Sequence, residues 1–283
     1  MEYMGQRLGQ HFLINEEKLK KVADALEINE GDVVIEVGPG HGELTQYLLE
    51  AGARVTALER DKALIDPLNK KFASQVIPPT PLVIPAKAGI QSVPAFEVIE
   101  GNALELLPMV VEELKQAGRS YMIAGNIPYY ITGYLLRVIE GLDHKPTRVV
   151  MTIQKEVAER ICATVPHMNL LAASVRFWAE PVIVEIVSKK DFNPPPKVDS
   201  ATIRLDVRQT EEVTGDAYYA FIKKIFTQPR KTIVNNLAGK EGNKEAVGDL
   251  LRSAGISPDA RPQTLDKEQL VALAKLFSSP GVI

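Results

Sequence analysis

The sequence predicts an α/β fold followed by a small helical domain, and two features of its pattern carry that prediction. Through about residue 180, short apolar runs alternate with amphipathic helical segments, which is typical of a sheet with crossover helices. Beyond Val207 only helical patterns remain. We therefore expect an α/β domain over residues 1–210 and an all-α domain over residues 211–283, with the boundary between Val207 and Thr214.

The first expected strand leads into a glycine-rich turn. Val33–Val37 is an apolar run that indicates a buried parallel strand, and a helix is expected directly after the glycines. Gly38, Gly40 and Gly42 allow a ligand to approach the backbone closely. Their G-x-G-x-G spacing differs from the G-x-G-x-x-G of dinucleotide sites. Glu36 would repel a phosphate, but it suits a ligand that carries an ammonium or sulfonium group.

Polar residues follow the next two expected strands. Arg54–Leu58 ends at Glu59, which is placed to accept hydrogen bonds from both hydroxyls of a ribose. Phe96–Ile99 leads to Asn102, whose polar side chain can reach an adenine edge. The order of these residues along the chain points to an adenosine-containing cofactor.

The fourth strand delivers an amide, a proline and an aromatic ring to its end. Tyr121–Gly125 is an apolar run, and Asn126, Pro128 and Tyr129 follow it. The amide oxygen and nearby carbonyls can accept from an exocyclic amine, Pro128 has no competing N–H, and Tyr129 can stack on a flat base. We interpret this segment, called the amine clamp below, as a site for an –NH2 group on a planar heterocycle. The alternative is an ordinary turn at a strand end.

The remaining helices and an insertion complete the predicted layout. Helical patterns cover Asn15–Leu26 at the start, and Ala217–Phe226, Thr232–Leu237, Lys244–Ala254 and Lys267–Phe277 near the end. A proline-rich segment at about 75–95 has little charge and no periodicity. It is expected to form an extended or disordered loop of neutral extra sequence, and a partner-binding arm is the less favoured reading.

Composition excludes several classes of protein. A single cysteine, Cys162, excludes a disulfide framework and a cysteine zinc cluster, and four scattered histidines indicate no metal site. No apolar run is long enough for a membrane span and no signal peptide is apparent, so we expect a cytoplasmic protein. The net charge of −3 does not suggest RNA binding, but residues 187–240 hold ten Lys/Arg against six Asp/Glu. That local excess is either a solvated helix face or a track for phosphates.

Taken together, these motifs resemble the ribosomal RNA adenine N6-dimethyltransferases, in particular those that dimethylate two adjacent adenosines near the 3′ end of 16S rRNA. The matching stretches span nearly the whole chain: Gly9–Leu13, Glu36–Gly42, Glu59–Asp61, Asn126–Ile131, Gln154–Ala158, Phe192–Ser200, Arg230–Thr232 and Asn235–Leu237. Three features depart from the family pattern. Asn102 stands where the family usually has Asp, and Gln228–Lys231 has one basic residue fewer than usual. The proline-rich insertion at about 75–95 replaces a connection that is shorter in the family.

The resemblance implies a Rossmann-like, seven-stranded class I methyltransferase domain that uses S-adenosylmethionine (SAM), with a helical domain that binds rRNA. It implies catalytic roles for Asn126, Pro128 and Tyr129. The residues implied to bind the cofactor are Gln10, His11, Leu13, Glu36, Gly38, Gly40, Gly42, Glu59, Arg60, Asn102, Ala103 and Asn126, with residues 10–13 as a lid. Those implied to contact RNA are Phe12, Phe192, Pro194, Lys197, Lys223, Arg230 and Lys231. We expect a monomer that acts on the small ribosomal subunit during its biogenesis, without a metal or a membrane partner.

Three other functions remain open from the sequence. A 23S rRNA adenine methyltransferase of the macrolide-resistance type would share the site, but the full Pro194–Ser200 run argues against it. An NAD-dependent dehydrogenase is disfavoured by the glycine spacing, by Glu36 and by the amine clamp. A ribosome-assembly factor without activity would not need an intact clamp.

Overall fold

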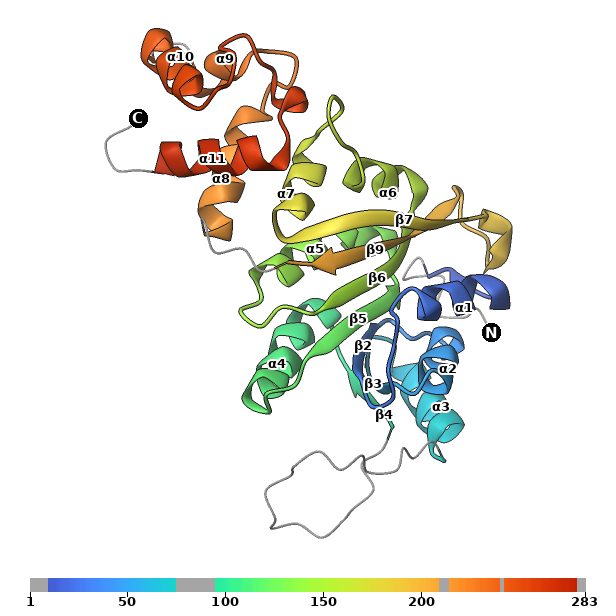
Figure 1. The fold of residues 1–283 in the computed structure, drawn as a ribbon. Helices are drawn as coiled ribbons and strands as arrows, with labels where there is room; N and C mark the ends of the chain where they lie inside the picture. Colours follow the sequence, from blue (N-terminus) through green and yellow to red (C-terminus); the bar gives the residue numbers. More distant parts are fainter. Residues whose placement is uncertain (1–9, 75–94, 209–213, 240–241, 279–283) are drawn as a thin grey trace. The chain divides into compact units, whose positions relative to one another are not determined.

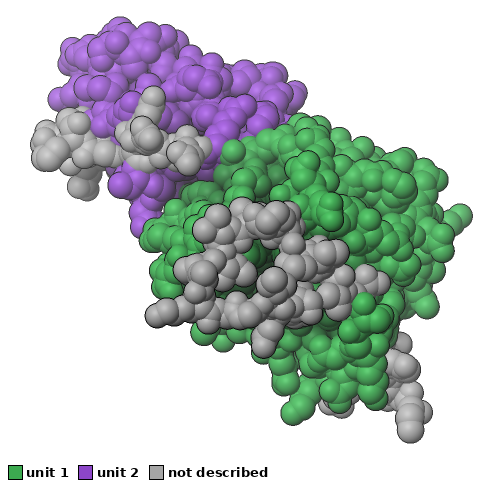
Figure 2. Space-filling model, turned by 60° about the horizontal axis from the view of Figure 1, so that its bottom comes forward, with its two compact units in different colours: residues 1–158, 182–207 green, residues 159–181, 208–283 purple. Residues whose placement is uncertain are grey.

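The computed structural model describes residues 10–74, 95–208, 214–239 and 242–278 (Figure 1). The proline-rich insertion therefore lies outside the described residues, except for its last residue, Ala95. The chain forms two compact units, which Figure 2 shows in separate colours: residues 1–158 with 182–207, and residues 159–181 with 208–283.

The first unit is built on a seven-stranded sheet, as expected. The strand order is β4 (Phe96–Glu100), β3 (Arg54–Glu59), β2 (Val33–Val37), β5 (Tyr121–Asn126), β6 (Arg148–Gln154), β9 (Ser200–Val207) and β7 (Ala179–Val187). The pairs from β4 to β6 are parallel, and β9 runs antiparallel to β6. This mixed sheet confirms the α/β prediction.

The central strands are buried because helices cover both faces of the sheet. Figure 1 shows α1 (Glu16–Asp24), α2 (Glu43–Glu50) and α3 (Lys62–Phe72) on one side of β2–β5, and α4 (Ala103–Gln116) and α5 (Thr132–Gly141) on the other. All five residues of β2 are buried. Strands that are apolar on both faces are typical of parallel sheets, and they hold the strand ends rigidly for a site.

Local sequence fixes where the helices begin. The side chains of Asn15, Asp61 and Asn102 accept hydrogen bonds from the first turns of α1, α3 and α4. Each of these caps satisfies a backbone N–H that has no partner within its helix. Two of the capping residues, Asp61 and Asn102, directly follow strands, so the helix caps and the predicted ligand residues occupy the same edge of the sheet.

The second unit is helical and begins earlier in the sequence than predicted. It contains α7 (Leu170–Trp178), α8 (Gly215–Ile225), α9 (Ile233–Ala238), α10 (Lys244–Ser253) and α11 (Lys267–Ser278). The last four agree with the predicted helices. Residues 159–181 join this unit because α7 packs on α8: the Phe177 and Tyr218 rings stack at 4.2 Å, and Tyr218 Oη donates to Ala173 O at 3.1 Å. In the described ranges, no helix is long and apolar enough to cross a membrane.

Candidate active site

The predicted motifs meet where the order of strands reverses. β3 and β4 extend the sheet on one side of β2, whereas β5 and β6 extend it on the other. β2 and β5 are parallel neighbours, with Glu36 paired to Ala124, so the glycine turn and the amine clamp lie side by side at their carboxyl ends. Such a switch point leaves a crevice at which α/β proteins bind ligands.

The glycine turn requires glycine for two separate reasons. Gly38 has φ +69°, and a Cβ there would meet nothing within 4 Å, so its backbone faces open space. Gly40 has φ +62°, and a Cβ there would lie 2.8 Å from the Phe12 ring. Positive φ strains other residues, and the Phe12 contact shows how closely an aromatic ring approaches this backbone. Gly42 is the residue before α2, and a Cβ there would lie 2.6 Å from the Phe72 ring.

Asn126 is oriented by the N-terminal segment. Its Nδ2 donates to His11 O at 2.7 Å. Because a carbonyl oxygen only accepts, this bond fixes which side of the amide carries the oxygen. No group within the described ranges donates to Asn126 Oδ1, so this acceptor remains available to an amine.

The N-terminal segment contacts residues 192–196, called the proline loop below, which lie about 180 residues further along the chain. β1 (Phe12–Leu13) pairs antiparallel with β8 (Phe192–Asn193), and His11 Nδ1 lies 2.8 Å from Pro194 O. The Phe12 ring also lies 4.6 Å from the His41 ring, over the glycine turn. The structure thus brings together the predicted lid, the clamp and the proline loop.

A small cavity of about 40 Å³ lies between these parts. Its lining is Gln10, His11, Phe12, Gly38, Gly40, Asn126, Ile127, Pro128, Tyr129 and Phe192. Gln10 Oε1 is buried there without a hydrogen-bond partner in the described ranges. Binding pockets for cofactors are usually several hundred Å³, so this cavity is smaller than a pocket that holds a whole cofactor.

Glu36 faces the interior and not the cavity. It is 1% exposed, and its Oε2 accepts from Thr45 Oγ1 of α2 at 2.6 Å. Burial raises the pKa of this carboxyl to about 8, although the Thr45 hydrogen bond opposes the shift.

Glu59, the last residue of β3, is hydrogen-bonded to the glycine turn. It is 1% exposed, its Oε1 accepts from Asp61 N at 2.7 Å, and its Oε2 accepts from Gly40 N at 3.3 Å. Burial raises the pKa of Glu59, while hydrogen bonds from the backbone N–H groups of Asp61 and Gly40 oppose that shift. Arg60, the next residue, is exposed.

The other predicted cofactor residues lie along the same edge or beneath it. Asn102 Oδ1 caps α4 through Leu104 N at 3.2 Å, and its Nδ2 donates to Glu105 Oε1 at 2.8 Å. Ala103 is the first residue of α4 and is buried. Leu13 is 3% exposed and belongs to the core, so its side chain supports the segment from below.

The predicted RNA residues fall in both units. Phe192 is 3% exposed and lines the cavity, whereas Pro194 and Lys197 are exposed beside it in sequence. In the helical unit, Lys223 lies near the end of α8, and Arg230 and Lys231 follow before α9; all three are exposed.

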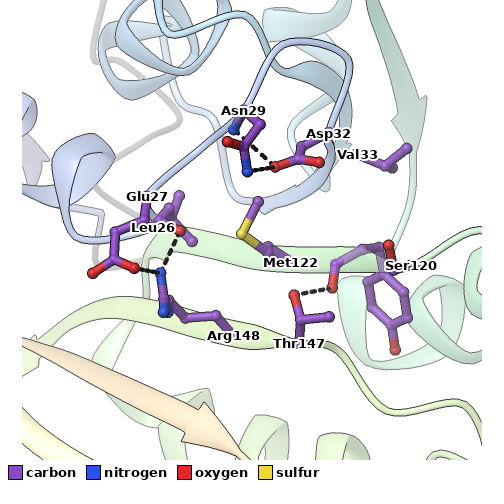
Figure 3. A pocket seen from close by; sticks show the side chains of 10 residues that line it. Leu26, Glu27, Asn29, Asp32, Val33, Ser120, Met122, Thr147 and Arg148 are labelled. Atoms are coloured by element: carbon purple, nitrogen blue, oxygen red, sulfur yellow. Dashed lines mark hydrogen bonds and ion pairs between the residues drawn. The ribbon is translucent and has the colours of Figure 1, made fainter.

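A second, larger cavity lies at the opposite edge of the sheet. It measures about 350 Å³ and includes the first residues of β2, β5 and β6 in its lining. Figure 3 shows Arg148 in this cavity, where it donates to Leu26 O at 2.7 Å and pairs with Glu27 at 2.8 Å. None of the residues predicted to bind cofactor, substrate or RNA lines it. No group of three potential metal ligands occurs in the part of the chain that the structure describes.

Three supporting residues were missed by the sequence reading. Gly125 precedes the clamp, and a Cβ there would lie 2.5 Å from Val37 O of the neighbouring strand. Ser200 Oγ lies 2.8 Å from Tyr129 Oη and so fixes that ring. Thr45 holds Glu36. A glycine inside an apolar strand does signal close backbone approach, so Gly125 was identifiable, whereas Ser200 and Thr45 carry no such signal.

Comparison with known proteins decides the family. The family model for ribosomal RNA adenine dimethylase matches residues 2–279. The chain belongs to this family. It is 38% identical to a ribosomal RNA small subunit methyltransferase A of Dehalococcoides mccartyi (strain CBDB1), over 93% of this chain and 84% of that protein. It is 36% identical to the protein of that name from Synechococcus sp. (strain CC9311), over 95% and 94%.

Solved structures support the dimethylase fold. A dimethyladenosine transferase from Plasmodium falciparum matches with a TM-score of 0.75 at 23% identity, over 93% of this chain and 96% of that one. The 23S rRNA methyltransferase ErmE matches with a TM-score of 0.69 at 24% identity, over 95% and 100%. Membership of this family makes the chain a SAM-dependent methyltransferase and sets aside the dehydrogenase alternative.

Proposed function

We propose that this dimethylase transfers methyl groups from SAM to N6 of two adjacent adenosines near the 3′ end of 16S rRNA. Family membership supports the chemistry, and the shared description of the curated relatives as small-subunit enzymes supports the substrate. The observation that carries the proposal is Asn126, whose amide is oriented by His11 so that Oδ1 is available to an amine.

The residues at the switch point fit SAM. Gly38 leaves backbone open to a ligand, and Gln10 Oε1 is a buried acceptor without a partner in the described ranges, which suits an ammonium group. Glu59 supplies a buried carboxylate at the end of the second strand for ribose hydroxyls. When bound, the cofactor supplies an electrophilic methyl group. Arg60, Asn102 and Ala103 follow β3 and β4 at the same edge and are proposed to contact its adenosine end.

Asn126 acts by positioning the substrate amine. Its Oδ1 accepts a hydrogen bond from N6–H of an adenosine taken out of the RNA stack, and this bond directs the nitrogen lone pair. Catalysis by orientation of this kind supplies a large part of the barrier reduction in transfer reactions. The N6 proton passes to water or a neighbouring acceptor after transfer, so the site needs no strong general base.

The aromatic residues hold the base in place. Tyr129 lines the cavity, and its hydroxyl is fixed by Ser200, so its ring is set before RNA arrives. Phe192 lies in β8, the strand that pairs with β1, and Pro194 directly follows that strand. A base that enters between these walls is held by stacking, worth roughly 1–3 kcal/mol per base.

Exposed cations supply sequence-independent affinity for RNA. Lys197 in the first unit and Lys223, Arg230 and Lys231 in the second are all exposed. We propose that they contact phosphates, that the enzyme works as a cytoplasmic monomer, and that it takes part in small-subunit biogenesis. Contacts of this kind make binding weaken as salt rises.

The deciding experiment uses the whole chain and small ribosomal subunits that lack the modification. The protein is incubated with radiolabelled SAM, and the labelled nucleotides are mapped. We expect label at two adjacent adenosines of 16S rRNA. Label confined to 23S rRNA would support the methyl transfer reaction but contradict the assignment of 16S rRNA as the substrate.

A further inference from the structure

Two tyrosine rings stand on the surface directly beyond the amine clamp. Tyr130 is 55% exposed and Tyr134 is 69% exposed, and they are the aromatic members of the set of exposed large apolar residues in the described ranges. Neither ring stacks on another aromatic ring there, and neither hydroxyl has a hydrogen-bond partner in those ranges. Such rings contribute little to folding.

The backbone places both rings on one face. Tyr129–Ile131 forms a single 3₁₀ turn, and Ile131 has helical dihedrals (φ −103°, ψ −6°) where it continues into α5. Tyr130 lies in this turn and Tyr134 in the first turn of α5. Residues four apart on a continuous helix have Cβ atoms roughly 5–6 Å apart and share one side, and the turn that leads into α5 gives these two residues a similar direction. Gly133 lies between them, and a Cβ there would meet nothing within 4 Å. The two rings therefore stand exposed on this part of the surface, and Gly133 adds no side chain beside them.

We propose that Tyr130 and Tyr134 form a stacking platform for the unpaired RNA nucleotides next to the target adenosine. This inference rests on the function proposed above. Tyr130 directly follows Tyr129, which lines the cavity, so the platform begins one residue beyond the site that receives the base.

Base extrusion explains why RNA needs such a surface. When an adenosine leaves the stack, the nucleotides beside it lose a stacking partner and expose their flat faces. An exposed ring replaces that partner irrespective of base identity, because every base has a π-face. Tyr130 and Tyr134 hold the flanking nucleotides at the mouth of the site while Asn126 and Tyr129 hold the target.

The test compares a double variant, Tyr130→Ala with Tyr134→Ala, with Met109→Ala as a matched control. Met109 is 64% exposed on α4, outside the proposed platform. We expect the double variant to bind an adenosine-containing single-stranded oligoribonucleotide about 5- to 100-fold more weakly than wild type. The KM for undermethylated small subunits rises by a similar factor, while kcat and SAM affinity hold. Replacement of both residues by Phe restores binding, since the ring is what stacks.

A second measurement separates stacking from a general effect. We expect oligoribonucleotides with abasic residues beside the adenosines to bind the wild type more weakly than intact oligoribonucleotides do. The double variant should bind the abasic and the intact oligoribonucleotides with the same affinity. Equal losses in both proteins would overturn the platform, as would a double variant that behaves like Met109→Ala. A defect seen with intact subunits but not with oligoribonucleotides would also overturn it and assign the face to a ribosomal protein. If the wild type methylates no small-subunit rRNA, the proposed function fails, and the abasic comparison still decides the platform.

Discussion

Gly125→Ala should disable the site through one added carbon. The new Cβ would lie 2.5 Å from Val37 O, about 1 Å inside the roughly 3.5 Å optimum for non-bonded heavy atoms. Val37 O is backbone of a strand paired to β5, so the two strands must part. Overpacking of this kind costs about 1–3 kcal/mol of unfolding free energy. Because Asn126 is the next residue, a displacement near 1 Å should also reduce kcat about 100-fold.

Urea denaturation and single-turnover methylation measure the two effects. Gly141→Ala is the matched control, since a Cβ there would meet nothing within 4 Å and Gly141 lies in α5. The control should keep its activity and gain up to about 1 kcal/mol from the better helix propensity of alanine. A Gly125→Ala variant with wild-type stability and kcat would refute the reasoning that close strand packing positions Asn126.

Three further predictions concern the cofactor side of the site. Glu36→Gln should gain stability relative to wild type as pH rises from about 5 to 8, by at most about 1.4 kcal/mol per pH unit. Burial raises the pKa of Glu36 to about 8, so the folded wild type keeps this carboxyl protonated over that range while the unfolded chain ionises it, and the wild type loses stability as pH rises. Denaturation at pH 5 and pH 8 checks this, and parallel pH profiles would contradict it. Glu59→Ala should weaken SAM binding by about 1.5–3 kcal/mol in calorimetry, and unchanged affinity would remove Glu59 from the ribose site. Asn102→Asp should hold or improve SAM affinity while losing the hydrogen bond to Glu105, and a tenfold loss of affinity would assign Asn102 another role.

The sequence predicted the elements of the fold well because their signals are local. The apolar runs ended within one residue of the ends of β2, β3 and β5, and the glycines marked the turn before α2. The ends of parallel strands share one edge, so the meeting of the glycine turn and the amine clamp followed from the strand pattern alone. The four C-terminal helices were likewise visible from their periodicity.

Contacts between distant segments were not predictable in this way. β9 pairs antiparallel with β6, and residues 159–181 belong to the helical unit. Both features depend on contacts with residues far along the chain. The pairing of Phe12–Leu13 with Phe192–Asn193 spans about 180 residues and has no local signature. The same holds for the partner of Glu36, since nothing local in the sequence indicates that Thr45 Oγ1 of α2 donates to this buried carboxyl.

Mass spectrometry of the digested rRNA, with wild type and Asn126→Ala compared, tests the central claim most directly. The wild type should yield N6,N6-dimethyladenosine at two neighbouring positions of small-subunit rRNA. Asn126→Ala should yield none while it still folds and binds RNA, because the lost group orients the amine and adds little ground-state affinity. Methyl groups found only on cytosine, on guanine or on protein would contradict the account, as would an Asn126→Ala variant that dimethylates at the wild-type rate.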